Sequence, residues 1–505
     1  MGGEWTDRLG EVELRIESRR LGDDGGPTLR VGPAGRGLEW LRFDCFDKNP
    51  HWHLDPTGRD EVQPLVGSPD PISEVFGMLR SDLPGLLERA GAPSTALASL
   101  RSTDLARRLL EAERRMRHRP ACLDELDIHR LRQRRSAKWH LHPDDILPAW
   151  VAEMDFPVAA SIQDELRRFV ESSDLGYPLE SEDTGLPRVF SERMQERFDW
   201  SPDPRRVELL SEVVQGLFIA LEAFTEKGEG AIVQTPIYPP FLAAVAETGR
   251  RLVENRMIRG GERLEFDLDG LADRIDPGTR ILLLCNPHNP SGRVMTQEEL
   301  DRLAALVLEH DLLVVSDEIH ADLVFEGRRH IPFASLGPEI ARRTITLTST
   351  SKAFNIPGLR CAIAHFGDAR LQARFNQLHP VHTRGGIGLL GIYASIAAWR
   401  WGQPWLDEVV PYLQANRDFV RERLAERIPE IGFDAPESTY LAWLDCAALP
   451  IEGSPASFFL RNGGIALSGG RRFGGGGDQH VRLNFATSRP ILSEAIDRMA
   501  KALGR

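Results

Sequence analysis

The sequence predicts an α/β protein in which helices cover both faces of a mostly parallel central sheet. Short runs of apolar and β-branched residues at 231–233, 281–284, 312–315 and 344–347 are typical of strands buried on both faces. Amphipathic helices alternate with these strands, and one of them starts at Thr296 with a capping box. Each of the four strands is followed by polar or aromatic residues. Because ligands of such sheets collect at the carboxyl ends of the strands, these residues are the candidates for a site.

Length and composition narrow the class of protein. A chain of 505 residues is too long for one typical core, so two or three domains are expected. The net charge of −13 argues against a nucleic-acid or anionic-membrane partner. No apolar run approaches the roughly 20 residues that span a bilayer, and the N-terminus lacks the apolar core of a signal peptide. Five scattered cysteines without a C-x-x-C pair fit a reducing cytoplasm and no zinc site. We therefore expect a cytoplasmic protein.

The first 70 residues differ in pattern from the rest. Alternating runs at 12–16, 28–31 and 39–43 predict half-buried strands. His51 and His53 would lie on the same side of an extended strand, where a metal ion is conceivable. With no third ligand in view, a structural or surface role is favoured and no metal is assigned.

Helices are predicted for residues 72–90 and 94–117, the second with leucines on one face and arginines elsewhere. From Leu123 the pattern becomes continuous α/β. We therefore expect a mostly β accessory domain, a helical linker, a segment leading into the main domain, a large domain and a small α+β domain, at residues 1–90, 91–122, 123–165, 166–404 and 405–505 respectively.

A single lysine follows the strand at 344–347. Burial makes a lysine costly to charge, and so favours the neutral, nucleophilic amine. An isolated loop lysine would more often reach solvent, but Lys352 is accompanied by Ser349, Ser351 and Arg360, a set suited to a phosphate group. A nucleophilic amine beside a phosphate cradle predicts pyridoxal 5′-phosphate (PLP) bound as a Schiff base.

The other three strands contribute Tyr238, Asn289 and the pair Asp317 and His320, in that order along the chain. This order of motifs resembles that of the aminotransferase class I/II superfamily of fold-type I PLP enzymes, over roughly residues 123–505. Several stretches are similar to cystathionine β-lyases of the MalY/PatB type, at 150–157, 176–178, 316–320, 351–357 and 438–445. The resemblance implies a fold-type I PLP-transferase with an extra N-terminal domain.

The resemblance also implies roles for residues around the PLP ring. Asp317 would sit against the pyridine nitrogen and keep it protonated, so that the ring accepts electrons from the substrate. Asn289 and His320 would reach the phenolic oxygen of the ring, and Tyr238 would stack on it. Arg482 matches the residue that binds the substrate α-carboxylate, to which a guanidinium is well suited.

Further donors are expected around the phosphate. Gly216 and Leu217 would open a helix at 217–224, whose free N–H groups suit an anion. Ser349, Ser351 and Arg360 would add side-chain donors. Tyr177 would reach the phosphate of a neighbouring subunit, which implies a homodimer with composite active sites.

The leading functional interpretation is a PLP-dependent carbon–sulfur β-lyase acting on cystathionine or another cysteine S-conjugate. Lys352, Asp317 and Tyr238 would be its catalytic residues, and the products a thiol, pyruvate and ammonia. An aminotransferase is the alternative, because it uses the same acid, base and electron sink. A non-catalytic PLP-binding regulator is a third possibility, which the intact set Lys352, Asp317 and Arg482 disfavours.

Overall fold

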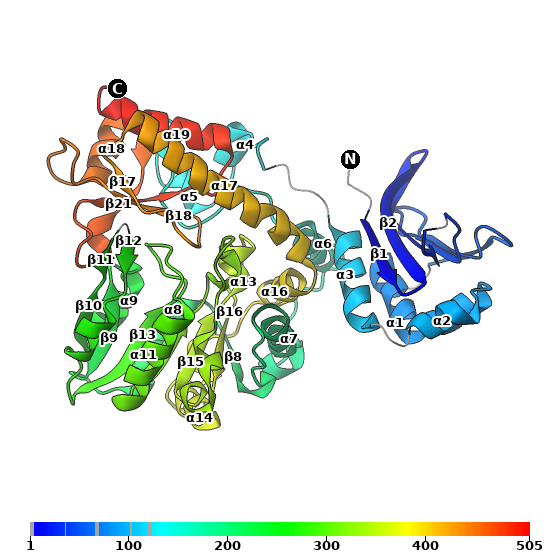
Figure 1. Cartoon of the computed structure of the whole chain (residues 1–505), viewed down its shortest axis with the longest axis horizontal. Coiled ribbons are helices and arrows are strands. Elements are labelled where there is room, and N and C mark those ends of the chain that lie inside the picture. The colour runs from blue at the N-terminus through cyan, green and yellow to red at the C-terminus, as the bar shows by residue number, and fades with distance from the viewer. Residues whose placement is uncertain (1–4, 36, 66–69, 101–103, 119–122, 262) are drawn as a thin grey trace. The chain divides into compact units, whose positions relative to one another are not determined.

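The computed structural model describes residues 5–505 except 36, 66–69, 101–103, 119–122 and 262 (Figure 1). The chain divides into two compact units. The first comprises residues 1–120, 159–174 and 400–405, and the second comprises residues 121–158, 175–399 and 406–505. No helix among the described residues has the length and apolar character needed to cross a membrane.

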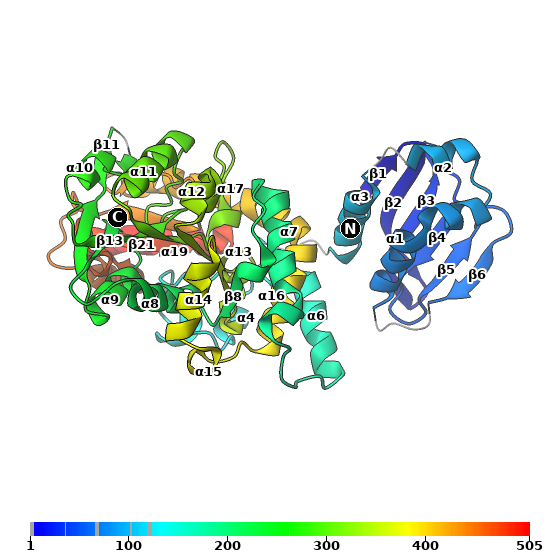
Figure 2. The ribbon, with the colours of Figure 1, turned by 90° about the horizontal axis from the view of Figure 1, so that it is seen from below.

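The first unit contains a six-stranded antiparallel sheet whose strands follow chain order (Figure 2). Its strands are β1 (Trp5–Leu9), β2 (Val12–Leu21), β3 (Asp24–Pro33), β4 (Leu41–Asp44), β5 (His51–Leu54) and β6 (Glu61–Pro64). The predicted strands at 12–16, 28–31 and 39–43 fall in β2, β3 and β4, so the mostly β character of this region is confirmed.

The two faces of this sheet differ in polarity, as the alternation of side chains along its strands requires. The apolar face, with Leu14, Leu29 and Phe43, packs with the helices α1 (Pro71–Arg89), α2 (Ser94–Leu100) and α3 (Leu105–Arg117). Leu109 and Met116 of α3 belong to the same core. The helix expected to be a linker is therefore part of the folded unit. The opposite face carries charged residues and is considered further below.

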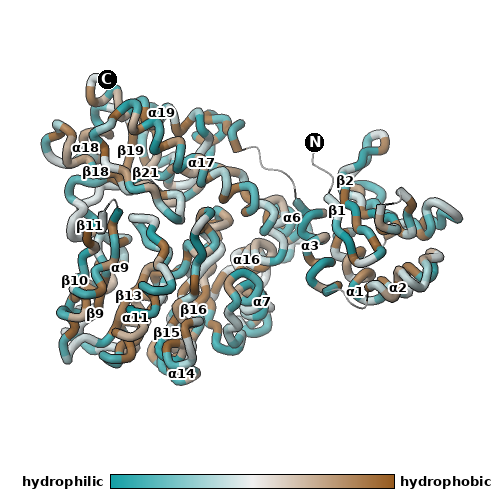
Figure 3. The backbone as a smooth tube through the Cα atoms, viewed as in Figure 1, coloured by the Kyte–Doolittle hydropathy of each residue, from teal (hydrophilic) through white to brown (hydrophobic). Residues whose placement is uncertain are grey.

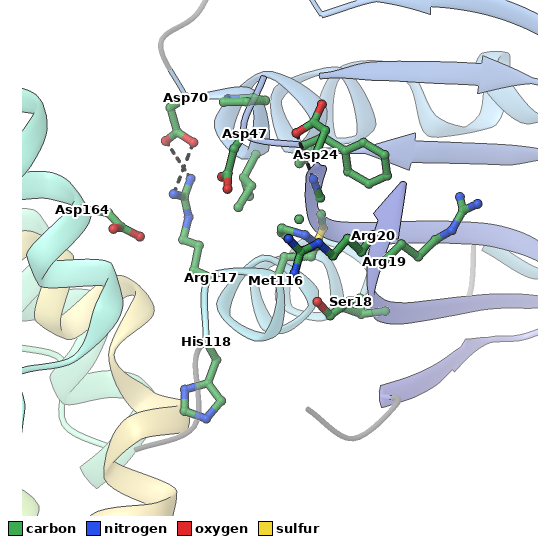
Figure 4. A pocket seen from close by; sticks show the side chains of 18 of the residues that line it. Ser18, Arg19, Arg20, Asp24, Asp47, Asp70, Met116, Arg117, His118 and Asp164 are labelled. Atoms are coloured by element: carbon green, nitrogen blue, oxygen red, sulfur yellow. Dashed lines mark hydrogen bonds and ion pairs between the residues drawn. The ribbon is translucent and has the colours of Figure 1, made fainter. Parts of the chain in front are cut away.

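An ion-pair cluster lies at the end of α3 (Figure 4). Arg117 Nη2 donates to Asp70 Oδ2 at 2.9 Å, and Arg168 of α6 (Ala160–Glu171) donates to the same oxygen at 2.5 Å. Burial alone would raise the pKa of Asp70, but the two guanidinium groups hold it below its ordinary value. This carboxylate is therefore fixed in its charged form.

The second unit is built on a seven-stranded sheet of order β10-β9-β13-β14-β15-β16-β8. Its strands are β8 (Val207–Leu210), β9 (Gly230–Thr235), β10 (Arg251–Arg256), β13 (Thr279–Cys285), β14 (Leu313–Asp317), β15 (Thr344–Thr348) and β16 (Ala362–Phe366). All neighbours from β10 to β15 pair in parallel, and β16 pairs antiparallel with both β15 and β8. The mostly parallel α/β prediction is therefore confirmed. Several of these strands are coloured hydrophobic in Figure 3, as strands buried on both faces should be.

Helices cover both faces of this sheet. Ala231 and Val233 contact the core that includes α8 (Val213–Phe224) and α9 (Pro239–Glu247). Ile232, between them, faces the core that includes α10 (Leu268–Ala272), α11 (Gln297–Glu309) and α12 (Pro338–Ala341). The capping box predicted at Thr296 is present at the start of α11.

The C-terminal part adds a four-stranded antiparallel sheet of order β17-β18-β21-β20. Its elements are β17 (Gly432–Phe433), β18 (Leu441–Asp445), α18 (Pro455–Gly463), β20 (Ser468–Gly469), β21 (His480–Asn484) and α19 (Arg489–Ala502). A short pair between β7 (Leu147–Pro148) and β19 (Ile465–Ala466) holds the segment around Trp150 against this sheet. The remaining elements are α4 (Ile128–Arg132), α5 (Ala137–His140), α7 (Leu186–Phe198), β11 (Ile258–Gly260), β12 (Arg263–Glu265), α13 (Thr350–Ala353), α14 (Ala369–Leu378), α15 (Val381–Arg384), α16 (Leu389–Trp401), α17 (Gln403–Arg427) and six short 3-10 helices.

Candidate active site

One cavity of the second unit lies at the carboxyl ends of the parallel strands. Tyr238 follows β9, Asn289 follows β13, Asp317 ends β14, and Lys352 follows β15; all four line this cavity, as does His320. The sheet topology brings these residues together because parallel strands end at the same edge.

Lys352 stands on the short helix α13, whose N-terminus is capped by the Ser349 side chain. Its Nζ donates to the backbone oxygen of Ala152 at 2.9 Å. Burial, assisted by the nearby charge of Arg482, lowers the pKa of Lys352 to about 8. A substantial share of the amine is therefore neutral near pH 7–8, in the form that attacks carbonyls and removes protons.

Asp317 is buried, with only 5% of its surface exposed. Its Oδ1 accepts a hydrogen bond from the Ile319 N–H at 3.1 Å. Burial raises the pKa of Asp317 to about 7, although the backbone hydrogen bond and the charge of Lys352 act in the opposite sense. No ion pair within 4 Å is found for this carboxylate among the residues that the structure describes. The site therefore suits a bound cation such as a protonated ring nitrogen.

Arg482 of β21 is also buried without a carboxylate partner in the described part of the chain. Its Nη1 donates to Asn289 Oδ1 at 2.9 Å, and its Nη2 donates to the Trp150 backbone oxygen at 3.2 Å. Burial lowers the pKa of Arg482 to about 10. Its Nε has no hydrogen-bond partner among the described residues, so the guanidinium can still donate to a substrate carboxylate. Arg482 does not itself line the cavity, but Asn289, which it contacts, does.

His320 is buried, and its Nδ1 has no hydrogen-bond partner in the described structure. Burial, together with the positive charges of Lys352 and Arg482, lowers the pKa of His320 to about 3. The ring is therefore neutral at physiological pH. Burial likewise raises the pKa of Tyr238. Both side chains are uncharged groups available beside a bound ring.

The expected side-chain donors for the phosphate belong to the same cavity. Ser349, Ser351 and Arg360 line it. Ser349 Oγ donates to the Cys361 backbone oxygen at 2.7 Å, and Arg360 Nη2 lies 3.2 Å from Glu212 Oε1. Ser351 is therefore the hydroxyl of the set with no side-chain hydrogen bond to another described residue. An anion would compete with Glu212 for Arg360.

The position of the neighbouring helix corrects one expectation. Helix α8 begins at Val213, four residues before the predicted start at Leu217. Its free N–H groups therefore belong to residues near Val213 and Val214, which line the cavity, and not to Gly216 and Leu217, which do not. Gly216 instead packs against β15, where an added Cβ would come within 2.7 Å of the Leu347 side chain.

Tyr177 is not brought to the cavity within one chain. Its side chain is fully exposed, and it is flanked by the exposed Leu175 and Leu179. The expected role of Tyr177 at a neighbouring subunit's site stays a prediction.

Two groups of the site escaped prediction from residue types. The Ala152 backbone oxygen accepts hydrogen bonds from both Lys352 Nζ, at 2.9 Å, and the buried Tyr440 hydroxyl, at 3.1 Å. The second group is the carboxylate of Glu212, which forms an ion pair with Arg360. Ala152 and Tyr440 do lie in stretches that resemble the MalY/PatB type, so that resemblance was the available signal.

These residues fit PLP. A neutral amine suits its aldehyde, an unpaired buried carboxyl suits its ring nitrogen, and a helix N-terminus with Ser351 and Arg360 suits its phosphate. The unpartnered Nδ1 of His320 and Nε of Arg482 leave hydrogen-bonding capacity for a ring substituent and a substrate carboxylate.

Comparisons with known proteins agree with this geometry. Residues 199–499 match the family model "Aminotransferase class I and II", and residues 8–116 match a domain of unknown function, DUF7700. The chain is 34% identical to cystathionine beta-lyase PatB of Bacillus subtilis, over 71% of this chain and 93% of that protein.

Two solved structures are similar to most of this chain. The crystal structure of OvoB shares 43% sequence identity, with a TM-score of 0.70, over 74% of this chain and 97% of that one. The PLP-bound C–S lyase of Staphylococcus hominis shares 29% identity, with a TM-score of 0.69, over 73% and 96% of the two chains.

Proposed function

The chain belongs to the aminotransferase class I and II family, and we propose from this that it is a PLP-dependent carbon–sulfur β-lyase. Its substrate is cystathionine or another cysteine S-conjugate, and its products are a thiol, pyruvate and ammonia. Lys352 and Asp317 lie in one cavity and supply the amine and the partner of the electron sink, which an aminotransferase would share. The observation that favours the β-lyase is the 34% identity to cystathionine beta-lyase PatB, over 71% of this chain and 93% of that protein. Relatives with this architecture include proteins named for the same activity.

PLP, when bound, supplies a sink for the electrons left at the substrate Cα after its proton is removed. Lys352 is the group that removes this proton, because its half-buried amine lies at the rim where the strands end and its pKa is lowered to about 8. Once the proton has left Cα, the bond from Cβ to sulfur breaks and the sulfur departs with its electron pair as a thiolate. Water then supplies the oxygen of pyruvate, and the nitrogen leaves as ammonia.

Asp317 and Arg482 orient and polarise the reacting molecule. Asp317 holds a proton at the ring nitrogen, since its carboxylate has no other described cation within reach and gains stability from a positive charge there. Arg482 binds the α-carboxylate of the substrate through its two-pronged guanidinium, and Asn289 fixes its direction by the 2.9 Å hydrogen bond.

An assay of products tests the reaction type. Purified protein is incubated with cystathionine, with and without a keto acid, and pyruvate and free thiol are measured against transamination products. We expect pyruvate and thiol in equal amounts without any keto acid. A requirement for the keto acid, with no thiol released, would show an aminotransferase instead. The Lys352→Ala variant serves as the blank.

We also propose that the active unit is a homodimer with composite sites. Tyr177, Leu175 and Leu179 are large apolar or aromatic side chains exposed on one short segment, which is typical of a surface that another chain covers. If Tyr177 reaches a partner's site, mixing inactive Tyr177→Ala and Lys352→Ala subunits restores activity at one hybrid site per dimer. Subunit exchange without any recovery of activity would contradict shared sites.

A further inference from the structure

A cluster of metal-ligating side chains lies on the charged face of the first unit's sheet, outside the candidate active site. Asp44 ends β4 and stands directly opposite His51 of β5 in the strand pairing. His53, two residues along β5, lies on the same face. The Asp44 Oδ2 atom is 3.6 Å from His51 Nε2 and 3.5 Å from His53 Nε2. The sheet register thus supplies the third ligand that the sequence pattern alone did not show.

The outer nitrogens of the two histidines are already engaged. His51 Nδ1 lies 2.8 Å from the Asn49 backbone oxygen, and His53 Nδ1 lies 2.6 Å from Asp60 Oδ1. Both partners are acceptors, so in each neutral ring the hydrogen resides on Nδ1. The Nε2 atoms of His51 and His53 therefore carry the lone pairs and face Asp44, although Arg42 competes for that of His53. Metal-binding histidines in proteins have the same arrangement, with Nδ1–H held by a carboxylate or a carbonyl.

We propose that Asp44, His51 and His53 bind a divalent transition-metal ion of the zinc type, with water completing the coordination. Ligands bonded at about 2.0–2.2 Å to a tetrahedral ion lie roughly 3.4 Å apart. The separations of 3.5 and 3.6 Å match this spacing, and the ligand atoms of all three residues lie within 4.8 Å of one another. His51, with 24% of its side chain exposed, gives the ion a route from solvent.

Arg42 is the competitor for this position. Its Nη2 lies 2.8 Å from His53 Nε2 and 3.2 Å from His53 Nδ1. A donor on the lone-pair axis of Nε2 would lie farther from Nδ1, so Arg42 is off that axis, and its contact with Nε2 must yield to a metal ion. Arg42 Nε also donates to Asp44 Oδ2, at 3.0 Å, and this hydrogen bond must yield to a metal ion.

A second carboxylate, that of Glu39, is close enough to bind Arg42 after a metal ion has displaced it from Asp44. Arg42 Nη1 lies 3.5 Å from Glu39 Oε2, a buried oxygen with no hydrogen-bond partner among the described residues. The other oxygen of Asp44, Oδ1, keeps its hydrogen bonds from Thr28 Oγ1, at 2.6 Å, and Arg19 Nη1, at 3.1 Å. A metal ion on Oδ2 would therefore leave Asp44 anchored while Arg42 turns to Glu39.

The test uses the full chain without an affinity tag, loaded with PLP, stripped of metal by a chelator and titrated with Zn²⁺ by calorimetry. We expect one tight zinc per chain, lost in His51→Gln. His129→Gln, at an exposed histidine of the second unit, is the matched control and keeps the binding. An unchanged circular dichroism spectrum and PLP absorbance show that the variants are folded.

Two further variants separate a metal site from a hydrogen-bonded charge network. Asp60→Asn preserves the shape at a left-handed position (φ 49°) that asparagine tolerates, and is expected to weaken zinc binding by about 10–100-fold. Arg42→Met removes the competitor and is expected to tighten zinc binding several-fold. If no zinc binds, or if His51→Gln and Asp60→Asn bind it as the unaltered chain does, the proposal is wrong.

Discussion

Two regions of the molecule, the arginine-paired carboxylates of the first unit and the cavity of the second unit, treat buried charge in opposite ways. In the first, the carboxylates of Asp44 and Asp70 each accept hydrogen bonds from two arginines, and their pKa values lie below the ordinary range even though burial opposes this. In the second, burial wins: the pKa of Asp317 is raised to about 7, while those of Lys352 and Arg482 are lowered to about 8 and 10. Burial therefore leaves Asp44 and Asp70 charged beside their arginines, whereas it shifts Asp317 of the cavity towards the neutral form.

This difference separates structural charge from reactive charge. A buried carboxylate such as Asp70, paired with two arginines, needs no ligand to stabilise its charge, and at Asp44 a metal ion would first have to displace Arg42. A buried charge without a protein partner is costly in the folded state, and such groups gather where a ligand supplies the missing partner. The contrast predicts that substitutions in the second unit change turnover, whereas those in the first change stability.

The largest expected effect is at Lys352. Lys352→Ala removes both the amine that fixes PLP and the base that takes the Cα proton, so turnover should fall by about 10⁴-fold, the upper end for one general base. Borohydride treatment followed by mass spectrometry measures the covalent adduct, which should disappear. Lys227→Ala, at an exposed lysine, is the control. A PLP adduct that persists on another lysine of the variant would refute the assignment.

Asp317→Asn tests the unpaired carboxyl at constant shape. Because the amide cannot hold a positive charge at the ring nitrogen, turnover should fall by about 10²–10³-fold, the usual effect of one electrostatic group. The protein should still bind PLP, which equilibrium dialysis can check. Turnover close to that of the unaltered enzyme would mean that the carboxylate is structural, like those of the first unit.

The lowered pKa of Lys352 predicts a pH profile for PLP capture. Only the neutral amine reacts, so the rate of reconstitution should rise about tenfold per pH unit at low pH and level off near pH 8. Stopped-flow absorbance of the cofactor measures this rate. Nα-acetyl-lysine, whose side-chain amine has an ordinary pKa, is the control for the pH profile of an unperturbed lysine. A rate that keeps rising to about pH 10, as for an ordinary lysine, would contradict the lowered pKa.

The smallest expected effect is at Asp70, and it concerns stability. Asp70→Asn should destabilise the first unit by about 1–2 kcal/mol, less than the 3–5 kcal/mol of a fully buried pair, because Arg117 retains Glu113 at 2.9 Å. Turnover should be unchanged. Asp23→Asn, whose side chain is 90% exposed, is the matched control. Urea unfolding followed by tryptophan fluorescence measures the difference.

The same variant has a defined pH dependence. The pKa of Asp70 is lower in the folded than in the unfolded chain, so its contribution is complete above about pH 5 and is lost as the pH falls through the folded pKa. The stability difference between the unaltered chain and Asp70→Asn should therefore shrink on acidification. A difference that grows at low pH would show that the ion pairs are not its cause.

Prediction from sequence succeeded for the polar site residues that directly follow a buried strand. Lys352 and Asp317 each follow a buried apolar run, and the sheet topology brings them together as expected. The start of α8 was misplaced because Glu212, its N-cap residue, makes no side-chain cap and leaves no Ser, Thr, Asp or Asn signal. Asp44 could not be matched with His51, because strand register is a long-range property that local alternation does not specify.

The oxygen shared by Lys352 and Tyr440 has a consequence for how the lysine moves. When Lys352 leaves Ala152 to bond with a cofactor, the Tyr440 hydroxyl remains on the same carbonyl at 3.1 Å. The departure therefore leaves no buried acceptor bare, a loss that would cost about 1–3 kcal/mol. The Ala152 carbonyl thus binds the amine before the cofactor does, and its hydrogen bond with Tyr440 holds the carbonyl in position after the lysine has left.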